Sequence, residues 1–158
     1  MNQPQPITAT IDIDASPDRV WAVVSDFVRM AEWSPECRRI MVLGEQKTGV
    51  GARFLGLNRR RWVAWPTSST IVRFEPSRAI AWQTRESGAR WTYELDATGS
   101  GTRLTGRRDL ADFTVLTKLF APVIGGAAGH DEELADGIRT TLARIKATVE
   151  QDAALPHA

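Results

Sequence analysis

Few side chains in this sequence could do chemistry, and Tyr93 stands out because it is the only tyrosine. Alternation along residues 90–97 places it on the same strand face as Trp91 and Leu95. A phenol on an apolar face can orient a ligand through its hydroxyl, or donate a proton when a neighbour shifts its pKa. Three polar residues are candidates for that neighbour: Thr84, Arg53 and Arg73.

The adjacent pair His130 and Asp131 is a second candidate. An imidazole oriented by a carboxylate can act as a general base, but such a base also needs a nucleophile to activate. Adjacent residues point apart on a helix, and Cys37 has no neighbour in the sequence that marks it as that nucleophile. We therefore favour capping or solvent exposure for His130 and assign no catalytic residue.

Metal and cofactor chemistry has little support in the sequence. His130, His157 and Cys37 lack the spacing of a metal site. The glycine-rich stretch 125–129 could cradle an anion at the start of a helix, but it lacks the Lys-Ser/Thr ending of a phosphate-binding loop and does not follow a strand. We expect no metal or other cofactor, and we interpret residues 122–129 as a flexible flap.

Composition indicates one domain over residues 1–158, with loose ends at residues 1–6 and 153–158. No run approaches about 18 consecutive apolar residues, so no stable membrane insertion is expected. The N-terminal residues lack the charged and apolar regions of a secretory signal, so a cytoplasmic protein is expected. The oligomeric state stays open.

The basic residues do not predict a nucleic-acid interface. Arginine is clustered at 38–39, 59–61 and 107–108, but 20 basic residues face 19 acidic ones and the net charge is only +1. Nucleic-acid binding would call for a continuous basic face on a recognised module. Solvated strand edges, kept from pairing with other chains by their charge, are the simpler interpretation.

The order of the predicted elements is strand, helix, a run of strands, and helix. Residues 7–15 alternate as a half-buried strand, and Ser16 and Pro17 supply the cap and first residue of a helix. A short turn over 29–33 ends before Pro35. Six further strands are predicted, at 38–43, 52–58, 62–75 with a break at Pro66, 79–86, 90–97 and 102–109. A short helix follows Leu110, and residues 130–152 form a long closing helix.

Short turns between these strands indicate an antiparallel meander with one covered face. The long helix provides the cover, because apolar residues recur along it at three- and four-residue steps. Such a helix is long enough to cross a whole sheet. The fold class is therefore α+β.

Several motifs in order resemble one family across essentially the whole chain. They are Ile11-x-Ile13-x-Ala15-Ser16-Pro17-x-x-Val20-Trp21-x-x-x-Ser25-Asp26-Phe27, Trp33-Ser34-Pro35, Arg90–Leu95 and Gly101–Thr105. This pattern resembles the polyketide cyclase/dehydrase-like branch of the START/birch-pollen-allergen (SRPBCC) superfamily. The resemblance implies the helix-grip fold, in which a curved antiparallel sheet of six to seven strands wraps around a long C-terminal helix and encloses an apolar cavity. It does not transfer an activity, because fold does not fix chemistry.

We expect the chain to bind or carry a hydrophobic small molecule, lipid- or polyketide-like, in that cavity. Two alternatives stay open: a cyclase, aromatase or dehydratase acting on a polyketide-like substrate, and a protein-interaction module whose cavity is filled. Aromatic and aliphatic residues on the covered faces are the predicted lining. These are Phe54, Trp82, Trp91, Tyr93, Phe120, Leu134 and Ile138.

Overall fold

A computed structural model describes residues 5–110 and 127–154. The elements, in chain order, are β1 (Ile7–Ile13), α1 (Pro17–Val24), the 3-10 helix η1 (Phe27–Arg29), α2 (Met30–Trp33), β2 (Cys37–Leu43), β3 (Arg53–Arg60), β4 (Val63–Glu75), β5 (Ala79–Thr84), β6 (Ala89–Ala97), β7 (Thr102–Leu110) and α4 (Ala127–Ala154).

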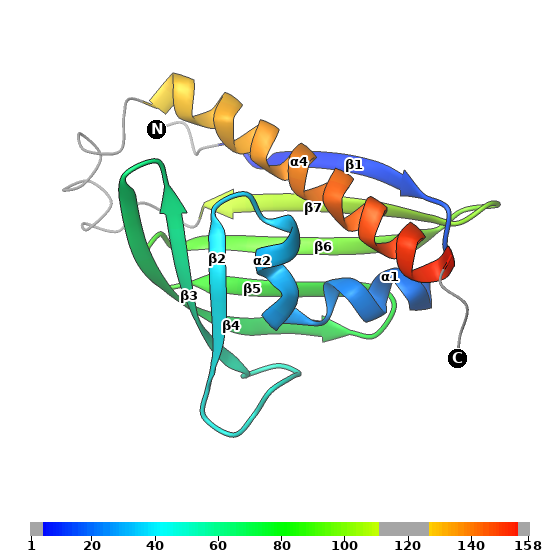
Figure 1. Ribbon diagram of the computed structural model, residues 1–158, viewed down its shortest axis with the longest axis horizontal. Helices are drawn as coiled ribbons and strands as arrows, with labels where there is room; N and C mark the ends of the chain where they lie inside the picture. The colour runs from blue at the N-terminus through cyan, green and yellow to red at the C-terminus, as the bar shows by residue number, and fades with distance from the viewer. Residues whose placement is uncertain (1–4, 111–126, 155–158) are drawn as a thin grey trace.

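The strands form one curved antiparallel sheet in the order β1-β7-β6-β5-β4-β3-β2. Strands β2 to β7 follow one another as a meander, and β1 closes the far edge by pairing with β7. Figure 1 shows α1, α2 and α4 on one face of this sheet. The predicted α+β helix-grip fold is confirmed.

Helix α1 begins where the sequence predicts. The Ser16 side chain accepts a hydrogen bond from the Arg19 backbone N–H at 3.4 Å, and Pro17 occupies the first helical position. Gly101 is required where the chain enters β7 beside the end of β1. A Cβ on Gly101 would be 2.1 Å from the Ile13 carbonyl oxygen, so only glycine fits there.

Two predicted boundaries are wrong. Strand β4 runs unbroken through Pro66, because β5 pairs with β4 only from Ser69 onward and the segment before it has β3 as its ladder partner. A proline on such an edge segment leaves no ladder acceptor unpaired.

Helix α4 begins at Ala127, so the last three residues of the predicted flap are helical. Residues 111–126, with the predicted short helix and the rest of the flap, lie outside the described residues.

The apolar stripe of α4 is buried as predicted at Ile138, Leu142, Ile145 and Val149. It packs mainly on β1, and to a smaller extent on β7, α1 and α2. The helix therefore covers the β1–β7 side and does not cross the whole sheet (Figure 1). The middle of the sheet is covered instead by α1 and η1, because Phe27 packs against Trp82 of β5 with 5.0 Å between ring centroids.

Polar contacts fix the C-terminal half of α4 at the end of β1. The Lys146 ammonium donates to the Asp12 carbonyl oxygen and to Glu150 Oε1, each at 2.7 Å. Glu150 Oε1 also accepts from the Asp14 backbone N–H at 3.2 Å. Within the described ranges, no helix is both long and apolar enough to cross a bilayer.

Candidate functional site

Five aromatic residues from four elements form a continuous cluster on the helix-covered face of the sheet. Phe27 packs against Phe54 and Trp82, with ring centroids 4.5 and 5.0 Å apart. Trp82 contacts Tyr93 edge-on at 5.3 Å and stacks on Trp91 at 6.4 Å. Cross-strand pairing sets this arrangement, because Trp82 is opposite Trp91 and Ile80 is opposite Tyr93. We call Phe27, Phe54, Trp82, Trp91 and Tyr93 the aromatic cluster.

Tyr93 lies on the helix-covered face of β6 together with Trp91 and Leu95, as alternation predicts. Its side chain is buried, and its register partner Gly106 leaves room for the ring below α4. Burial raises the pKa of Tyr93, so the phenol stays protonated at neutral pH. Among the described residues, the hydroxyl makes no hydrogen bond. The group can therefore act as a hydrogen-bond donor to a guest, but not as a base.

The three predicted neighbours of Tyr93 are engaged elsewhere. Thr84 is buried and shares a hydrogen bond with Ser69, with 3.2 Å between the two hydroxyl oxygens. Arg53 is exposed. Arg73 forms a bidentate ion pair with Glu75. None of these three candidates accounts for the shifted pKa of Tyr93, because burial is its cause.

Arg108 is the basic residue that the sheet brings to this face. It lies opposite Trp91 in the β6–β7 register, and its guanidinium carbon is 5.5 Å from the centre of the Trp91 ring. This geometry is a cation–π contact, which holds the charge against the aromatic wall. Arg108 is half-buried, so a desolvated positive charge lies at the Trp91 end of the cluster.

The predicted lining residues fall into three groups. Phe54, Trp82, Tyr93 and Ile138 are buried, and Phe54 is packed tightly by Phe27. Trp91 and Leu134 are half-buried. Phe120 lies outside the described residues. The structure thus brings Trp82, Trp91 and Tyr93 into direct contact, and it places Ile138 beside them across Gly106. Their role as ligand contacts stays a prediction.

Sequence reasoning missed Phe27, Gly106 and Arg108. Phe27 contacts the sheet only because η1 lies over it, and that position is a tertiary feature that no local pattern encodes. Arg108 carried a usable signal, because Leu104, Gly106 and Arg108 alternate on one face of a strand. The adjacent Arg107 obscured that pattern, because two consecutive arginines at 107–108 are typical of a solvated strand edge.

Two candidates for catalysis gain no support. Cys37 is buried, and desolvation raises the pKa of its thiol to about 11, so the nucleophilic thiolate is disfavoured at neutral pH. His130 lies within α4 and not before it, because the helix begins at Ala127.

The fold and the aromatic cluster together define a helix-grip protein with an apolar concave face and a few polar groups. The family described as polyketide cyclase / dehydrase and lipid transport matches residues 4–150, and the chain belongs to this family. The resemblance read from the sequence is thereby confirmed.

Solved structures show the same fold at low sequence identity. The Zhui aromatase/cyclase from a Streptomyces species is 15% identical with a TM-score of 0.72, over 94% of this chain and 95% of that one. The di-domain aromatase/cyclase StfQ of the steffimycin biosynthetic pathway is 15% identical with a TM-score of 0.73, over 95% of this chain and 52% of that one. TTHA0849 from Thermus thermophilus is 13% identical with a TM-score of 0.71, over 95% of this chain and 100% of that one. No curated protein sequence matches the chain.

Proposed function

We propose that this protein binds and carries a hydrophobic small molecule, lipid- or polyketide-like, against the aromatic cluster. One observation carries the proposal. The Tyr93 hydroxyl and the Arg108 guanidinium lie on a largely aromatic and aliphatic face, on which the Ser69 and Thr84 hydroxyls already bond to each other. An apolar wall with few polar groups is the usual composition of a small-molecule site. The cytoplasmic location expected from the sequence is part of this proposal.

The two polar groups favour a ligand with an apolar body and at least one oxygen. Tyr93 is protonated at neutral pH, so it donates to a carbonyl, hydroxyl or carboxylate oxygen. Arg108 adds a positive charge two residues further along β7 than Gly106, the partner of Tyr93. A carboxylate near Arg108 would gain a charge-assisted hydrogen bond, which is stronger than a neutral one.

Native mass spectrometry of freshly purified protein tests the proposal first, by detecting a co-purified mass. Titration with fatty acids, sterols and aromatic polyketides then tests binding through the intrinsic emission of the six tryptophans, of which Trp82 and Trp91 lie in the aromatic cluster. We expect a saturable change in emission for at least one of these ligand classes. The absence of both a co-purified mass and any saturable change would overturn the proposal.

The conservative variant Tyr93→Phe localises the site, because it removes only the hydroxyl. The affinity for an oxygen-bearing ligand is expected to fall by roughly threefold to tenfold, the value of a neutral hydrogen bond. The matched control is Thr92→Ser, since Thr92 is the neighbouring residue on β6 and packs on the opposite face. An equal loss in both variants would place the ligand elsewhere.

A second candidate is cyclisation, aromatisation or dehydration of a polyketide-like substrate. The observation that favours it is that the protonated Tyr93 phenol and the half-buried Arg108 guanidinium lie on one face of the sheet, since both can donate hydrogen bonds to a substrate carbonyl and stabilise negative charge that develops on its oxygen. The test is product formation from a poly-β-ketone thioester analogue. Tyr93→Phe is expected to lower kcat with a smaller effect on KM if the phenol hydrogen-bonds to the substrate oxygen more strongly in the transition state.

A further inference from the structure

The hairpin that joins β3 to β4 presents an exposed apolar apex. Trp62 is 93% exposed and Val63 is 62% exposed, and the following Ala64 is exposed as well. Single apolar residues on a surface need no explanation, but here three consecutive ones form the end of a projecting hairpin (Figure 1). We call residues 59–65 the hairpin tip.

The turn at the hairpin tip contains a residue whose backbone conformation is unfavourable for its type. Arg61 has a φ of 52°, which is the left-handed region that glycine or asparagine normally occupies in a tight hairpin turn. An arginine there costs conformational energy that glycine would not cost. The Arg59 side chain supports the turn by donating from Nε to the Arg61 carbonyl oxygen at 3.2 Å. The sequence therefore keeps a long basic side chain where a smaller residue would fit better.

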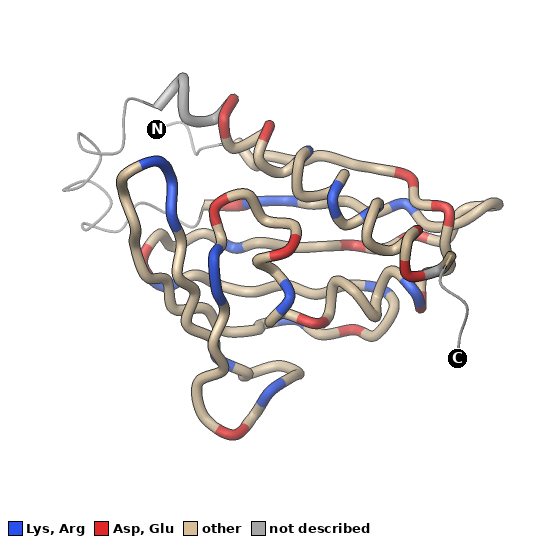
Figure 2. The backbone as a smooth tube through the Cα atoms, in the orientation of Figure 1, with Lys and Arg blue, Asp and Glu red and all other residues tan. Residues whose placement is uncertain are grey.

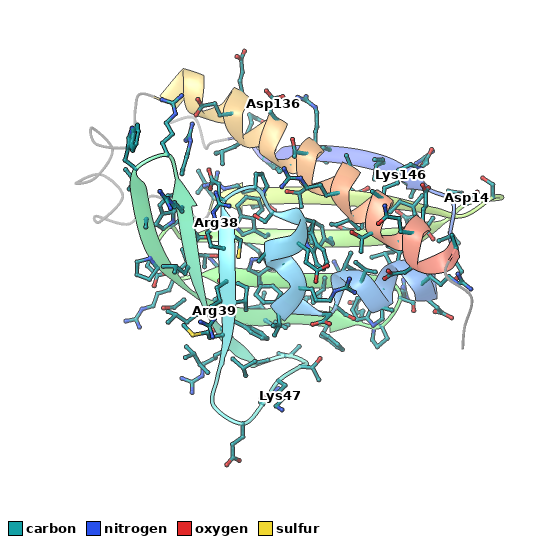
Figure 3. The ribbon with its side chains drawn as sticks, in the orientation of Figure 1. Asp14, Arg38, Arg39, Lys47, Asp136 and Lys146 are labelled. Atoms are coloured by element: carbon teal, nitrogen blue, oxygen red, sulfur yellow. The ribbon has the colours of Figure 1, made fainter. Side chains whose placement is uncertain are left out.

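Basic residues lie at the tip and along the adjoining strand β2. Arg59 and Arg61 are exposed at the tip, and Arg38 and Arg39 are exposed on β2, which pairs with β3. The two segments are adjoining, since the Arg59 backbone N–H donates to the Glu36 carbonyl oxygen at 2.8 Å. Figure 2 shows the basic residues of the tip and of β2, and Figure 3 labels Arg38 and Arg39.

We infer that the hairpin tip docks peripherally on an anionic lipid bilayer. Trp62 and Val63 enter the headgroup region, while Arg59 and Arg61 contact lipid phosphates. Tryptophan favours the membrane–water interface because its ring is apolar and its N–H can still be solvated. Basic residues beside it are attracted by the negative surface potential of acidic lipids. An indole and a valine flanked by arginines match a surface whose apolar interior lies just below a layer of phosphates, so the apex favours a lipid bilayer over an acidic protein.

The tip is joined to α4 near the start of the helix. Arg60 forms an ion pair with Glu133, so it lies toward α4 while Arg59 and Arg61 are left at the surface. A docked tip would bring this end of α4 close to the bilayer. The inference is independent of the proposed function, because docking is measured without any ligand and a chain that binds no ligand could still dock.

Cosedimentation with large unilamellar vesicles tests the inference. One vesicle population is phosphatidylcholine alone, and the other contains equal parts of phosphatidylcholine and phosphatidylserine. We expect binding to the acidic vesicles that weakens with added salt, and much weaker binding to the neutral ones. Trp62→Ala is expected to weaken binding by roughly tenfold or more, because an indole no longer leaves water. Arg59→Gln with Arg61→Gln is expected to weaken it by roughly fivefold per charge removed.

The variant Arg61→Gly separates docking from stability. Glycine relieves the positive φ, so the melting temperature is expected to stay equal or rise. Vesicle affinity is nevertheless expected to fall severalfold, because one charge is lost. A merely structural role for Arg61 would leave vesicle affinity unchanged.

Two matched controls lie away from the tip. Val50→Ser removes an exposed valine in the β2–β3 loop, and Arg90→Gln removes an exposed arginine on β6. Both are expected to bind acidic vesicles as the parent protein does. The inference is overturned if the parent protein does not bind acidic vesicles, or if the controls weaken binding as much as the tip variants. Binding that is insensitive to Trp62→Ala would also overturn it, since the indole would then not contact lipid.

Discussion

Gly106 of β7 lies directly against Ile138 of α4, so closely that a Cβ on the glycine would be 3.2 Å from Ile138 Cγ2. The same Cβ would be 3.3 Å from Leu142 Cδ2 and 3.5 Å from Tyr93 Cε1. This one position therefore joins the closing helix, the sheet and the aromatic cluster. The absence of a side chain sets the separation between helix and sheet at the candidate site.

The first prediction is that Gly106→Ala destabilises the protein. The added methyl would be closer than an ordinary contact to Ile138 and Leu142, so these neighbours must shift, at a cost of about 1–3 kcal/mol in the free energy of unfolding. The matched control is Gly137→Ala, because nothing lies within 4 Å of a Cβ there. That change should stabilise α4 by about 0.5–1 kcal/mol through helix propensity. Urea unfolding measures both, and equal effects of the two changes would contradict the packing described.

The second prediction concerns alkaline pH. Burial raises the pKa of the Cys37 thiol from 9.0 to about 11 and raises the pKa of Tyr93 as well. Both groups lose their protons more readily in the unfolded chain, so their stabilising contribution is complete below pH 9. It is lost as the pH rises toward 11. The free energy of unfolding should therefore decline over this range, and Cys37→Ala should decline less steeply.

The burial of Cys37 also predicts how fast its thiol reacts. A thiol-specific disulfide reagent at pH 8 should react slowly with the folded protein and rapidly in concentrated urea, since the thiolate is the reactive form. Rapid reaction of the folded protein would show that the thiol is accessible and ionised.

The aromatic cluster shows how far strand alternation carries a prediction. The shared faces of Trp82 with Ile80, and of Trp91 with Tyr93, follow from a period of two along each strand, and the structure confirms both. Pairing between the strands follows from their short turns. Phe27 could not be placed, because its contact with Trp82 depends on where η1 lies over the sheet. Local sequence does not encode that position.

The boundaries that failed have similar causes. Pro66 reads as a break because proline disrupts a ladder that is paired on both sides, but β4 is paired on one side at that point. Whether β4 is paired on both sides at Pro66 depends on where β5 ends, and no residue near Pro66 indicates that position. Gly129 reads as part of a flap on propensity, but α4 begins at Ala127 and continues through it, at a propensity cost of about 1 kcal/mol relative to alanine.

The third prediction concerns ligand choice. Arg108→Met keeps an unbranched apolar side chain beside Trp91 while removing the charge. If a carboxylate lies near Arg108, a fatty acid should lose affinity by about tenfold or more, while the fatty alcohol of equal length should change little. Calorimetric titration of both ligands gives the comparison. Equal losses for acid and alcohol would show that Arg108 acts on the packing of Trp91 and not on the ligand charge.

The last prediction separates structural from ligand-binding hydroxyls. Ser69 and Thr84 are a buried cross-strand pair, and their hydroxyl oxygens are 3.2 Å apart. Ser69→Ala leaves the Thr84 hydroxyl buried without its partner, so the free energy of unfolding should fall by about 1–3 kcal/mol. Adding Thr84→Val removes that polar group and should recover part of the loss, giving a coupling energy above about 0.5 kcal/mol in a double-mutant cycle.

The ligand affinities of Ser69→Ala, Thr84→Val and the double variant show whether these two hydroxyls also contact the ligand. Because each hydroxyl already has the other as a partner, we expect the affinity for an apolar ligand to change by less than about twofold. A larger loss in Thr84→Val than in Ser69→Ala would show that the ligand takes the Thr84 hydroxyl away from Ser69. The polar part of the site would then extend from Arg108 across β5 toward Phe54, which lies opposite Ser69 in the β3–β4 register.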